Sequence, residues 1–344
     1  MRINHSYLIS LLTAAALLSI PFLFAFSPIP EVNITDENPY LGRWALHLPE
    51  GAGWLEVRDE GDYLDADILW YGGSVVPVNH VYKHEGKLFL NQLAWRSAQR
   101  KNGRKHRPVY QLVLEGSGDE LIGKMVQPDP NGRGAKTTVF LATRIPDLPA
   151  APNLDKLKYG KAVNLLANNS TEGWRLVDPE SKSAWSVEKG VLMNKPVQHK
   201  GEKHINYGNL RTNDTFEDFN LQLKVNVPEG NNSGIYLRGI YEIQVFDSYG
   251  KKRDSHHMGA LYSRITPSES AEKKPGKWQE LDITLCDRHL TVILNGTKII
   301  DNQAIMGVTG GALTADEFSP GPLYLQGDHG EVMYKDIVLT PILK

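Results

Sequence analysis

The sequence contains almost no cysteine. Among its 344 residues only Cys286 carries a thiol, so the chain cannot form an internal disulfide and has no cysteine pair that could bind zinc. Cys286 ends the strand-like run that begins at Leu281, and we interpret it as a small buried side chain. The protein must therefore be held together by its hydrophobic cores.

The sequence also lacks a strong charge of either sign and long helical apolar periods. The formal net charge is −2 at pH 7, which gives no general attraction to nucleic acid or to membrane surfaces. Glycine and proline are frequent instead, with 31 and 20 residues, as in chains of many short strands and turns. We therefore expect an all-β protein without a nucleic-acid partner.

The one long apolar run lies at the N-terminus. Arg2 and His5 precede an apolar stretch over residues 7–26, and Ala25-Phe26-Ser27 at its end lies near a plausible cleavage point, which is the order of a secretory signal peptide. The stretch is also about long enough to cross a bilayer, so an uncleaved anchor is the alternative for residues 1–27. Either reading predicts export to the periplasm or the cell surface, with the membrane as a partner only if this segment stays uncleaved.

Residues 40–145 are predicted to form a first β-module. About eight short alternating segments follow one another there, with Gly or Asp at most breaks, which indicates a meander that forms a closed or nearly closed barrel. Gly42-Arg43-Trp44 on the first strand and Arg144 after the last resemble the ends of lipocalin-like barrels. Because closure would bring these ends together, we predict that Arg144 lies over the ring of Trp44.

A proline-rich linker over residues 146–158 separates this module from a second one over residues 159–344. In the second module, apolar side chains alternate with polar ones over residues 219–227, which indicates a strand with one buried face. Asn295-Gly296 between two apolar runs indicates a tight hairpin. These patterns predict a two-sheet sandwich of the jelly-roll type.

The richest polar pattern of the second module lies in residues 231–250. If Gly239–Tyr241 forms a turn, the two-residue period places Arg238 opposite Glu242 and Tyr236 opposite Gln244 on one sheet face. A bulge further along would bring Asp247 onto the same face. Such a face suits a sugar, although a solvated ion pair between Arg238 and Glu242 is the simpler alternative.

Two resemblances extend this interpretation. The spacing Glu242-x-Gln244-x-x-Asp247 is similar to the E-x-D-x-x-E strand of laminarinase-type glucanases, which share the concanavalin-like jelly roll, but the altered second and third acids speak against a retaining double-carboxylate mechanism. The whole second module is similar to the 3-keto-disaccharide hydrolase domain family of exported bacterial proteins. Its landmarks are Gly173-Trp174, Trp185–Leu192, Asn232–Gly239, Tyr241–Gly250, Pro275–Gln279, Leu294–Gly296 and Gly321–Gln326 followed by His329-Gly330.

The second resemblance implies an enzyme that cleaves glycosidic bonds of 3-keto-glycosides. A carbonyl at carbon 3 acidifies the proton on carbon 2, so a base can remove it and expel the anomeric oxygen, after which water adds back. This route needs a base, an acid for the leaving group and a group that stabilises the enolate oxygen, here Arg238 or a bound cation. The candidate catalytic residues are Glu242, His329 and Asp247, with Glu242 or His329 as the base. The candidate substrate-binding residues are Tyr236, Arg238, Gln244 and Gln326.

Three points stay open at this stage. The cofactor is unknown; a divalent cation is one option, with Glu242, Asp247 and His257 as candidate ligands. A non-catalytic, lectin-like carbohydrate-binding module on the same fold is the main alternative to an enzyme, and a structural cell-surface adaptor is a third. A cluster of titratable groups at the site would favour the enzyme, because a lectin needs aromatic and amide groups rather than titratable ones.

We predict that the mature protein begins between about Ala25 and Glu31, where the apolar stretch ends. N-terminal sequencing of the protein from its native host checks this. A start at Met1 in the membrane fraction would favour the uncleaved anchor instead.

Overall fold

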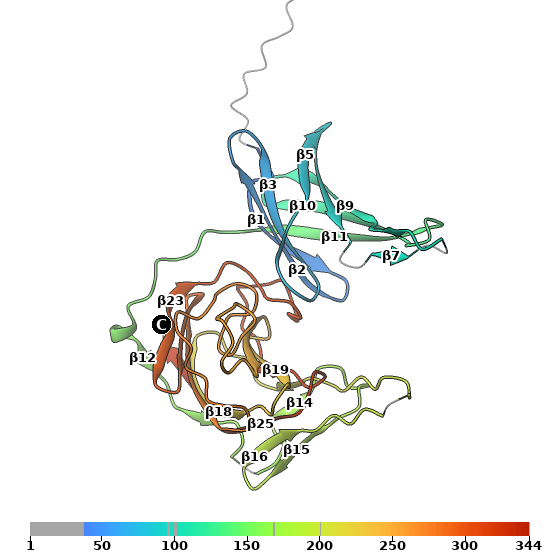
Figure 1. The fold of residues 1–344 in the computed structure, drawn as a ribbon. Coiled ribbons are helices and arrows are strands. Elements are labelled where there is room, and N and C mark those ends of the chain that lie inside the picture. Colours follow the sequence, from blue (N-terminus) through green and yellow to red (C-terminus); the bar gives the residue numbers. More distant parts are fainter. Residues whose placement is uncertain (1–37, 95–96, 100–101, 168, 200, 344) are drawn as a thin grey trace, which may run out of the picture. The chain divides into compact units, whose positions relative to one another are not determined.

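The computed structural model describes residues 38–343 except 95–96, 100–101, 168 and 200 (Figure 1). The fold is all-β, with 50% strand and 1% helix, so the predicted class is confirmed. Residues from Pro39 onward form one compact unit. The predicted signal or anchor, residues 1–27, lies outside the described part. Among the residues described, none of the helices is long and apolar enough to cross a membrane.

The first module is one curled antiparallel sheet in the order β4-β3-β2-β1-β11-β10-β9-β6-β5. Its strands are β1 Gly42–Leu48, β2 Gly51–Asp59, β3 Leu64–Trp70, β4 Val76–Pro77, β5 His80–His84, β6 Lys87–Leu93, β9 Val109–Ser117, β10 Glu120–Pro128 and β11 Ala135–Ile145; β7 Ala98–Gln99 and β8 Lys105–His106 form a separate pair. Only two residues separate the edge strands β4 and β5, so the sheet must curl until its edges approach each other. The lipocalin-like barrel is thus nearly closed, as predicted.

Trp44 and Arg144 join the first and last strands of this barrel. The indole ring of Trp44 is fully buried, and the guanidinium carbon of Arg144 lies 4.3 Å from the ring centroid. Arg144 also donates hydrogen bonds to the backbone oxygens of Leu41 and Pro39, at 2.7 and 2.8 Å. The predicted contact between Arg144 and Trp44 is confirmed.

The second module consists of two antiparallel sheets that share one core. The larger sheet has the order β15-β16-β25-β18-β21-β22-β23, with β12 and β13 also paired to β25, and the smaller has the order β14-β17-β24-β19-β20. The larger contains β12 Lys158–Tyr159, β13 Val163–Asn164, β15 Trp185–Glu188, β16 Val191–Asn194, β18 Phe219–Asn226, β21 Gln279–Cys286, β22 His289–Leu294, β23 Thr297–Ala304 and β25 Val332–Leu343. The smaller contains β14 Trp174–Leu176, β17 Leu210–Thr212, β19 Asn232–Leu237, β20 Tyr241–Phe246 and β24 Tyr324–Leu325, and the short 3₁₀ helix η1 Leu154–Lys156 precedes both.

The local patterns of the sequence explain these strands. On β18 the side chains of Phe219, Leu221 and Leu223 are all at most 3% exposed, which places the alternating apolar set in the core as predicted. Asn295 and Gly296, with φ of 51° and 85°, form the two-residue turn between β22 and β23 because both tolerate the left-handed conformation. Cys286 is buried, in agreement with its interpretation as a small apolar side chain.

We expect Arg144→Ala to lower the free energy of unfolding by about 1–2 kcal/mol. The change removes the cation–π contact with Trp44 and the hydrogen bonds to Leu41 and Pro39, which hold the last strand of the barrel to the start of the first. Denaturant unfolding measures this, with Arg133→Ala in the exposed loop after β10 as the control. Equal midpoints for the two variants would contradict a structural role of Arg144.

Candidate active site

A cavity of about 600 Å³ lies beside the smaller sheet of the jelly roll, a size that is typical of small-molecule sites. From the jelly roll it is lined above all by Tyr236, Glu242, Gln244, Tyr324, Gln326 and His329. Five of the seven residues predicted for catalysis or substrate binding therefore line one cavity. Arg238 and Asp247 do not.

The predicted register of the hairpin β19–β20 is wrong by two residues. Tyr236 pairs with Glu242 rather than with Gln244, and Arg238 lies in the turn instead of on the strand. Arg238 and Gly239 both have left-handed backbones, with φ of 54° and 69°, so the turn closes one residue earlier than predicted. A shift of two residues leaves each side chain on the same face, which is why Tyr236, Glu242 and Gln244 still share the cavity.

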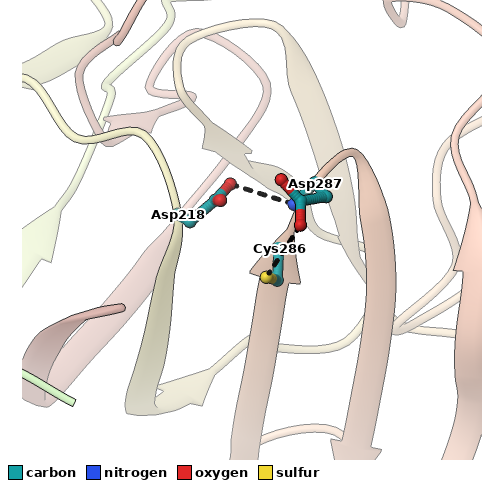
Figure 2. Close-up of side chains that lie close together, drawn as sticks. All are labelled: Asp218, Cys286 and Asp287. Carbon is teal, nitrogen blue, oxygen red and sulfur yellow. Dashed lines mark hydrogen bonds between the residues drawn. The ribbon is translucent and has the colours of Figure 1, made fainter. Parts of the chain in front are cut away.

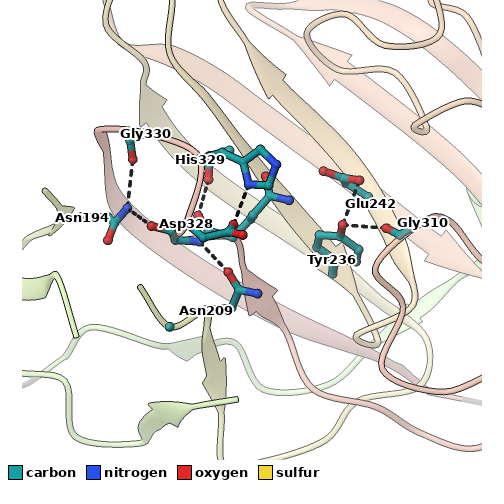
Figure 3. Close-up of polar contacts among 12 residues, drawn as sticks. Asn194, Asn209, Tyr236, Glu242, Gly310, Asp328, His329 and Gly330 are labelled. Atoms are coloured by element: carbon teal, nitrogen blue, oxygen red, sulfur yellow. Dashed lines mark hydrogen bonds and ion pairs between the residues drawn. The ribbon is translucent and has the colours of Figure 1, made fainter. Parts of the chain in front are cut away.

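Glu242 is a buried carboxyl group held by its neighbours on the hairpin. Its side chain is 4% exposed, and Oε2 accepts a hydrogen bond of 2.9 Å from the hydroxyl of Tyr236. Gly234 on the paired strand leaves room for the carboxyl, since a Cβ there would lie 2.2 Å from Oε1. Figure 3 shows Tyr236 bridging Glu242 and the backbone oxygen of Gly310, which it reaches at 2.8 Å.

Burial dominates the electrostatics of Glu242. Loss of solvent raises the pKa of its carboxyl from an ordinary 4.5 to about 8, although the hydrogen bond from Tyr236 and the charge of nearby His329 lower it. Burial, followed by the charge of Glu242, raises the pKa of the Tyr236 hydroxyl. Glu242 therefore keeps its proton at neutral pH, and a carboxylic acid of this kind can donate a proton.

His329 forms the second titratable group of the cavity. Its Nδ1 lies 2.6 Å from the Asp328 carboxylate, and this hydrogen bond is the main reason that the pKa of His329 is raised. Because Asp328 accepts the proton of Nδ1, the lone pair of the neutral imidazole lies on Nε2. Asp328 thus fixes the orientation of the imidazole and favours its protonated form, and only the neutral form can act as a base through Nε2.

Two asparagines hold the loop that carries this dyad (Figure 3). The side-chain amide of Asn194 donates to the backbone oxygens of Gly327 and Gly330, at 2.7 and 2.9 Å. The side-chain oxygen of Asn209 accepts the amide proton of Gly327 at 2.8 Å. These bonds fix the position of the dyad relative to strand β24.

Three amide groups add hydrogen-bonding capacity. The side-chain oxygens of Asn232, Gln244 and Gln326 are shielded from solvent and have no hydrogen-bond partner within the described part of the chain. All three residues line the cavity. A buried acceptor without a partner is costly, and the hydroxyl groups of a sugar are donors that would satisfy it.

Three predicted residues lie elsewhere. Arg238 donates through Nη2 to the backbone oxygens of Glu317 and Ser319, at 2.8 and 2.6 Å, and lines a second cavity of about 300 Å³. The predicted bulge does not bring Asp247 to the site, because its carboxylate accepts the amide proton of Gly230 at 3.0 Å, past the end of β20. His257 stacks on Phe246 with ring centroids 5.9 Å apart. Arg238 is therefore not placed to stabilise an enolate in the first cavity.

The structure does not gather the predicted metal ligands Glu242, Asp247 and His257 into one group. Within the described ranges, Asp218, Cys286 and Asp287 are the only acidic, cysteine or histidine side chains that form such a group, with ligand atoms within 4.8 Å of one another (Figure 2). The amide of Asp287 already donates to the Asp218 carboxylate at 3.1 Å, and the thiol of Cys286 lies 3.8 Å from the Asp287 carboxylate. We interpret the group as a brace of the β21–β22 hairpin.

Several cavity residues were not predicted from the sequence. These are chiefly Asn209, Asn232, Tyr262, Gly310, Tyr324 and Asp328. The sequence offered a signal for two of them: Asp328 directly precedes His329, and Asn232 begins the family landmark Asn232–Gly239. No local pattern points to Asn209 or Gly310, since both reach the site through long-range contacts.

The family assignment follows from the second module. Residues 161–340, just over half of the chain, match the family described as the 3-keto-alpha-glucoside-1,2-lyase-like domain. The chain belongs to this family. The resemblance inferred from the sequence is thereby confirmed, and membership of the 3-keto-alpha-glucoside-1,2-lyase-like family supports a carbohydrate-active function.

The protein is also distantly similar to several solved structures. A candidate glycosyl hydrolase from Parabacteroides distasonis is 26% identical, with a TM-score of 0.42 over 56% of this chain and 92% of that one. A second from the same organism is 24% identical, with a TM-score of 0.40 over 53% and 100%. The carbohydrate-binding module CBM66 from Bacillus subtilis is 13% identical, with a TM-score of 0.33 over 49% and 95%. No curated protein matches.

We expect the contribution of Glu242 to the free energy of unfolding to fall as the pH rises from about 4.5 to about 8. The native state holds this proton more tightly than the unfolded chain, so unfolding becomes easier as the proton is lost from the unfolded state first. Glu242→Gln should remove about 2–4 kcal/mol of this decrease, because one pKa unit corresponds to about 1.4 kcal/mol.

Denaturant unfolding of the wild type and of Glu242→Gln at pH 5 and pH 8 measures the difference. Glu280→Gln, an exposed glutamate on β21, serves as the control and should leave the pH dependence unchanged. The same pH dependence in all three proteins would mean that Glu242 titrates normally.

Proposed function

We propose that the protein is an exported enzyme that cleaves the glycosidic bond of 3-keto-glycosides. The observation that carries the proposal is the pairing of two titratable groups of opposite role in one cavity: a Glu242 carboxyl that stays protonated at neutral pH and an imidazole oriented by Asp328. Family membership of residues 161–340 supports the substrate class. Export rests on the signal-like segment over residues 1–27.

The cleavage proceeds by elimination followed by hydration. His329 takes the proton from carbon 2 of the keto sugar, and the electron pair of that C–H bond forms an enolate with the carbon 3 carbonyl. The enolate then expels the anomeric oxygen as the C1–O bond breaks, and Glu242 gives its proton to the leaving oxygen. Water adds to the resulting double bond and yields the free keto sugar.

The division of roles between the two residues follows from their surroundings. A group with a pKa of about 8 is protonated at pH 7 and suits the donor, which here is Glu242. His329 is half-exposed and hydrogen-bonded to a carboxylate, so its Nε2 suits the acceptor. The unpaired amide oxygens of Asn232, Gln244 and Gln326 would accept hydrogen bonds from the hydroxyl groups of the sugar.

A leaving-group comparison tests these roles. A 4-nitrophenyl 3-keto-glucoside expels a stable phenolate without protonation, whereas a 3-keto-disaccharide expels an alkoxide that needs an acid. Glu242→Gln should therefore lose about 10²–10⁴ in rate on the disaccharide and far less on the nitrophenyl substrate, while His329→Ala should lose as much on both. Initial rates on the two substrates measure this, with His257→Ala, outside the cavity, as the matched control.

Two outcomes would contradict the proposal in different ways. Equal losses for Glu242→Gln on both substrates would remove Glu242 as the acid. Unchanged turnover in both variants would remove the cavity as the site of the reaction.

A non-catalytic carbohydrate-binding module is the second candidate. It is favoured by the three amide residues that line the cavity, Asn232, Gln244 and Gln326, since amide groups can bind hydroxyl groups without a catalytic role. Saccharide binding by the wild type without turnover of any 3-keto-glycoside would decide for this alternative.

A further inference from the structure

Part of the cavity is lined by the first module. Glu50 and Gly51, where β1 turns into β2, and residues 71–73, which follow β3, contribute to its walls. These residues lie outside the segment 161–340 that matches the family. The cavity is therefore a product of both modules.

The barrel turn at residues 71–73 touches the jelly roll through backbone atoms. The amide of Gly311 donates to the backbone oxygen of Tyr71 at 3.1 Å. A Cβ on Gly310 would lie 2.1 Å from the backbone oxygen of Gly73, so only glycine allows this approach. Backbone contacts of this kind hold the turn in one position.

The loop that meets the barrel turn also holds Glu242. The hydroxyl of Tyr236 lies between the backbone oxygen of Gly310, at 2.8 Å, and Oε2 of Glu242, at 2.9 Å, and its single proton serves one of these two acceptors at a time. The Oγ1 atom of Thr309 accepts the amide proton of Glu242 at 2.9 Å. One short loop therefore sets the position of Tyr71 relative to the acid of the site.

Further contacts secure the same arrangement. Ser74 Oγ lies 2.8 Å from His256 Nε2, and the guanidinium carbon of Arg264 lies 4.4 Å from the ring centroid of Trp54 on β2. Arg264 also donates to the backbone oxygen of Val308, just before the loop. The part of the cavity wall that the barrel forms is thus held to the jelly roll both at Ser74 and at Trp54.

The side chains on this wall have the chemistry of a sugar subsite. Tyr71 has a left-handed backbone, with φ of 65°, which is costly for a residue other than glycine and often marks a functional position. Its half-buried ring packs edge-on against Trp70, with centroids 5.3 Å apart, and offers an aromatic surface. Glu50 is exposed and offers a carboxylate that can accept hydrogen bonds from hydroxyl groups.

We propose that Tyr71 and Glu50 form a second sugar-binding subsite, which holds the part of the substrate that extends beyond the reacting ring. This inference rests on the proposed function, because it assigns the two residues to the same cavity as Glu242 and His329. It gives the barrel a role in substrate selection: Tyr71 and Glu50 determine how well a disaccharide binds relative to a single sugar ring.

Two substrates of different length test the subsite. Tyr71→Ala should lower kcat/KM for a 3-keto-disaccharide about tenfold, mainly through a higher KM, and leave methyl 3-keto-glucoside almost unchanged; one aromatic contact is typically worth about that factor. Glu50→Gln should show the same selectivity with a smaller effect. Tyr63→Ala and Glu120→Gln, exposed barrel residues outside the cavity, are the matched controls.

Calorimetric binding of an unoxidised disaccharide and of methyl glucoside separates this inference from the proposed function. If the wild type turns over no 3-keto-glycoside, the proposed function fails, and the subsite must still appear as a selective loss of disaccharide affinity in Tyr71→Ala. Equal losses on both ligands would indicate a positioning role and overturn the subsite. So would the absence of any loss, or a wild type that binds neither sugar.

Discussion

The chemistry of the cavity depends on a carboxyl group that the sheet removes from water. Glu242 lies within a strand of the smaller sheet, where the missing side chain of Gly234 leaves it room. Burying a carboxylate is costly, and the protein avoids most of that cost by keeping the group protonated. The hydroxyl of Tyr236 supplies a hydrogen bond that fixes the carboxyl without compensating fully for the lost solvent.

Glu242 and the dyad of Asp328 and His329 share one cavity but have different surroundings. The two groups hold their protons for different reasons: burial raises the pKa of the enclosed Glu242, and the hydrogen bond to Asp328 raises that of the half-exposed His329. Asn194 and Asn209 hold the loop of the exposed partner in place through hydrogen bonds to Gly327.

The sequence predicted the face of the hairpin but not its turn. The two-residue period of a strand places Tyr236, Glu242 and Gln244 together in any register that differs by two residues, so this prediction was insensitive to the turn. The predicted position of Arg238, in contrast, depended on where the turn begins. Its side chain is anchored by the backbone oxygens of Glu317 and Ser319, far away in the sequence, and no local pattern could reveal that choice.

The close approach of Gly310 to Gly73 couples the two modules mechanically. Any residue with a Cβ at position 310 would collide with the barrel backbone, and the displacement would pass directly to the oxygen that binds Tyr236. A different barrel joined to the jelly roll would have to bring an equally unobstructed backbone to this position. A chimera that keeps only the family segment would therefore keep Glu242 and the loop of Gly310 but lose the barrel backbone that packs against this loop.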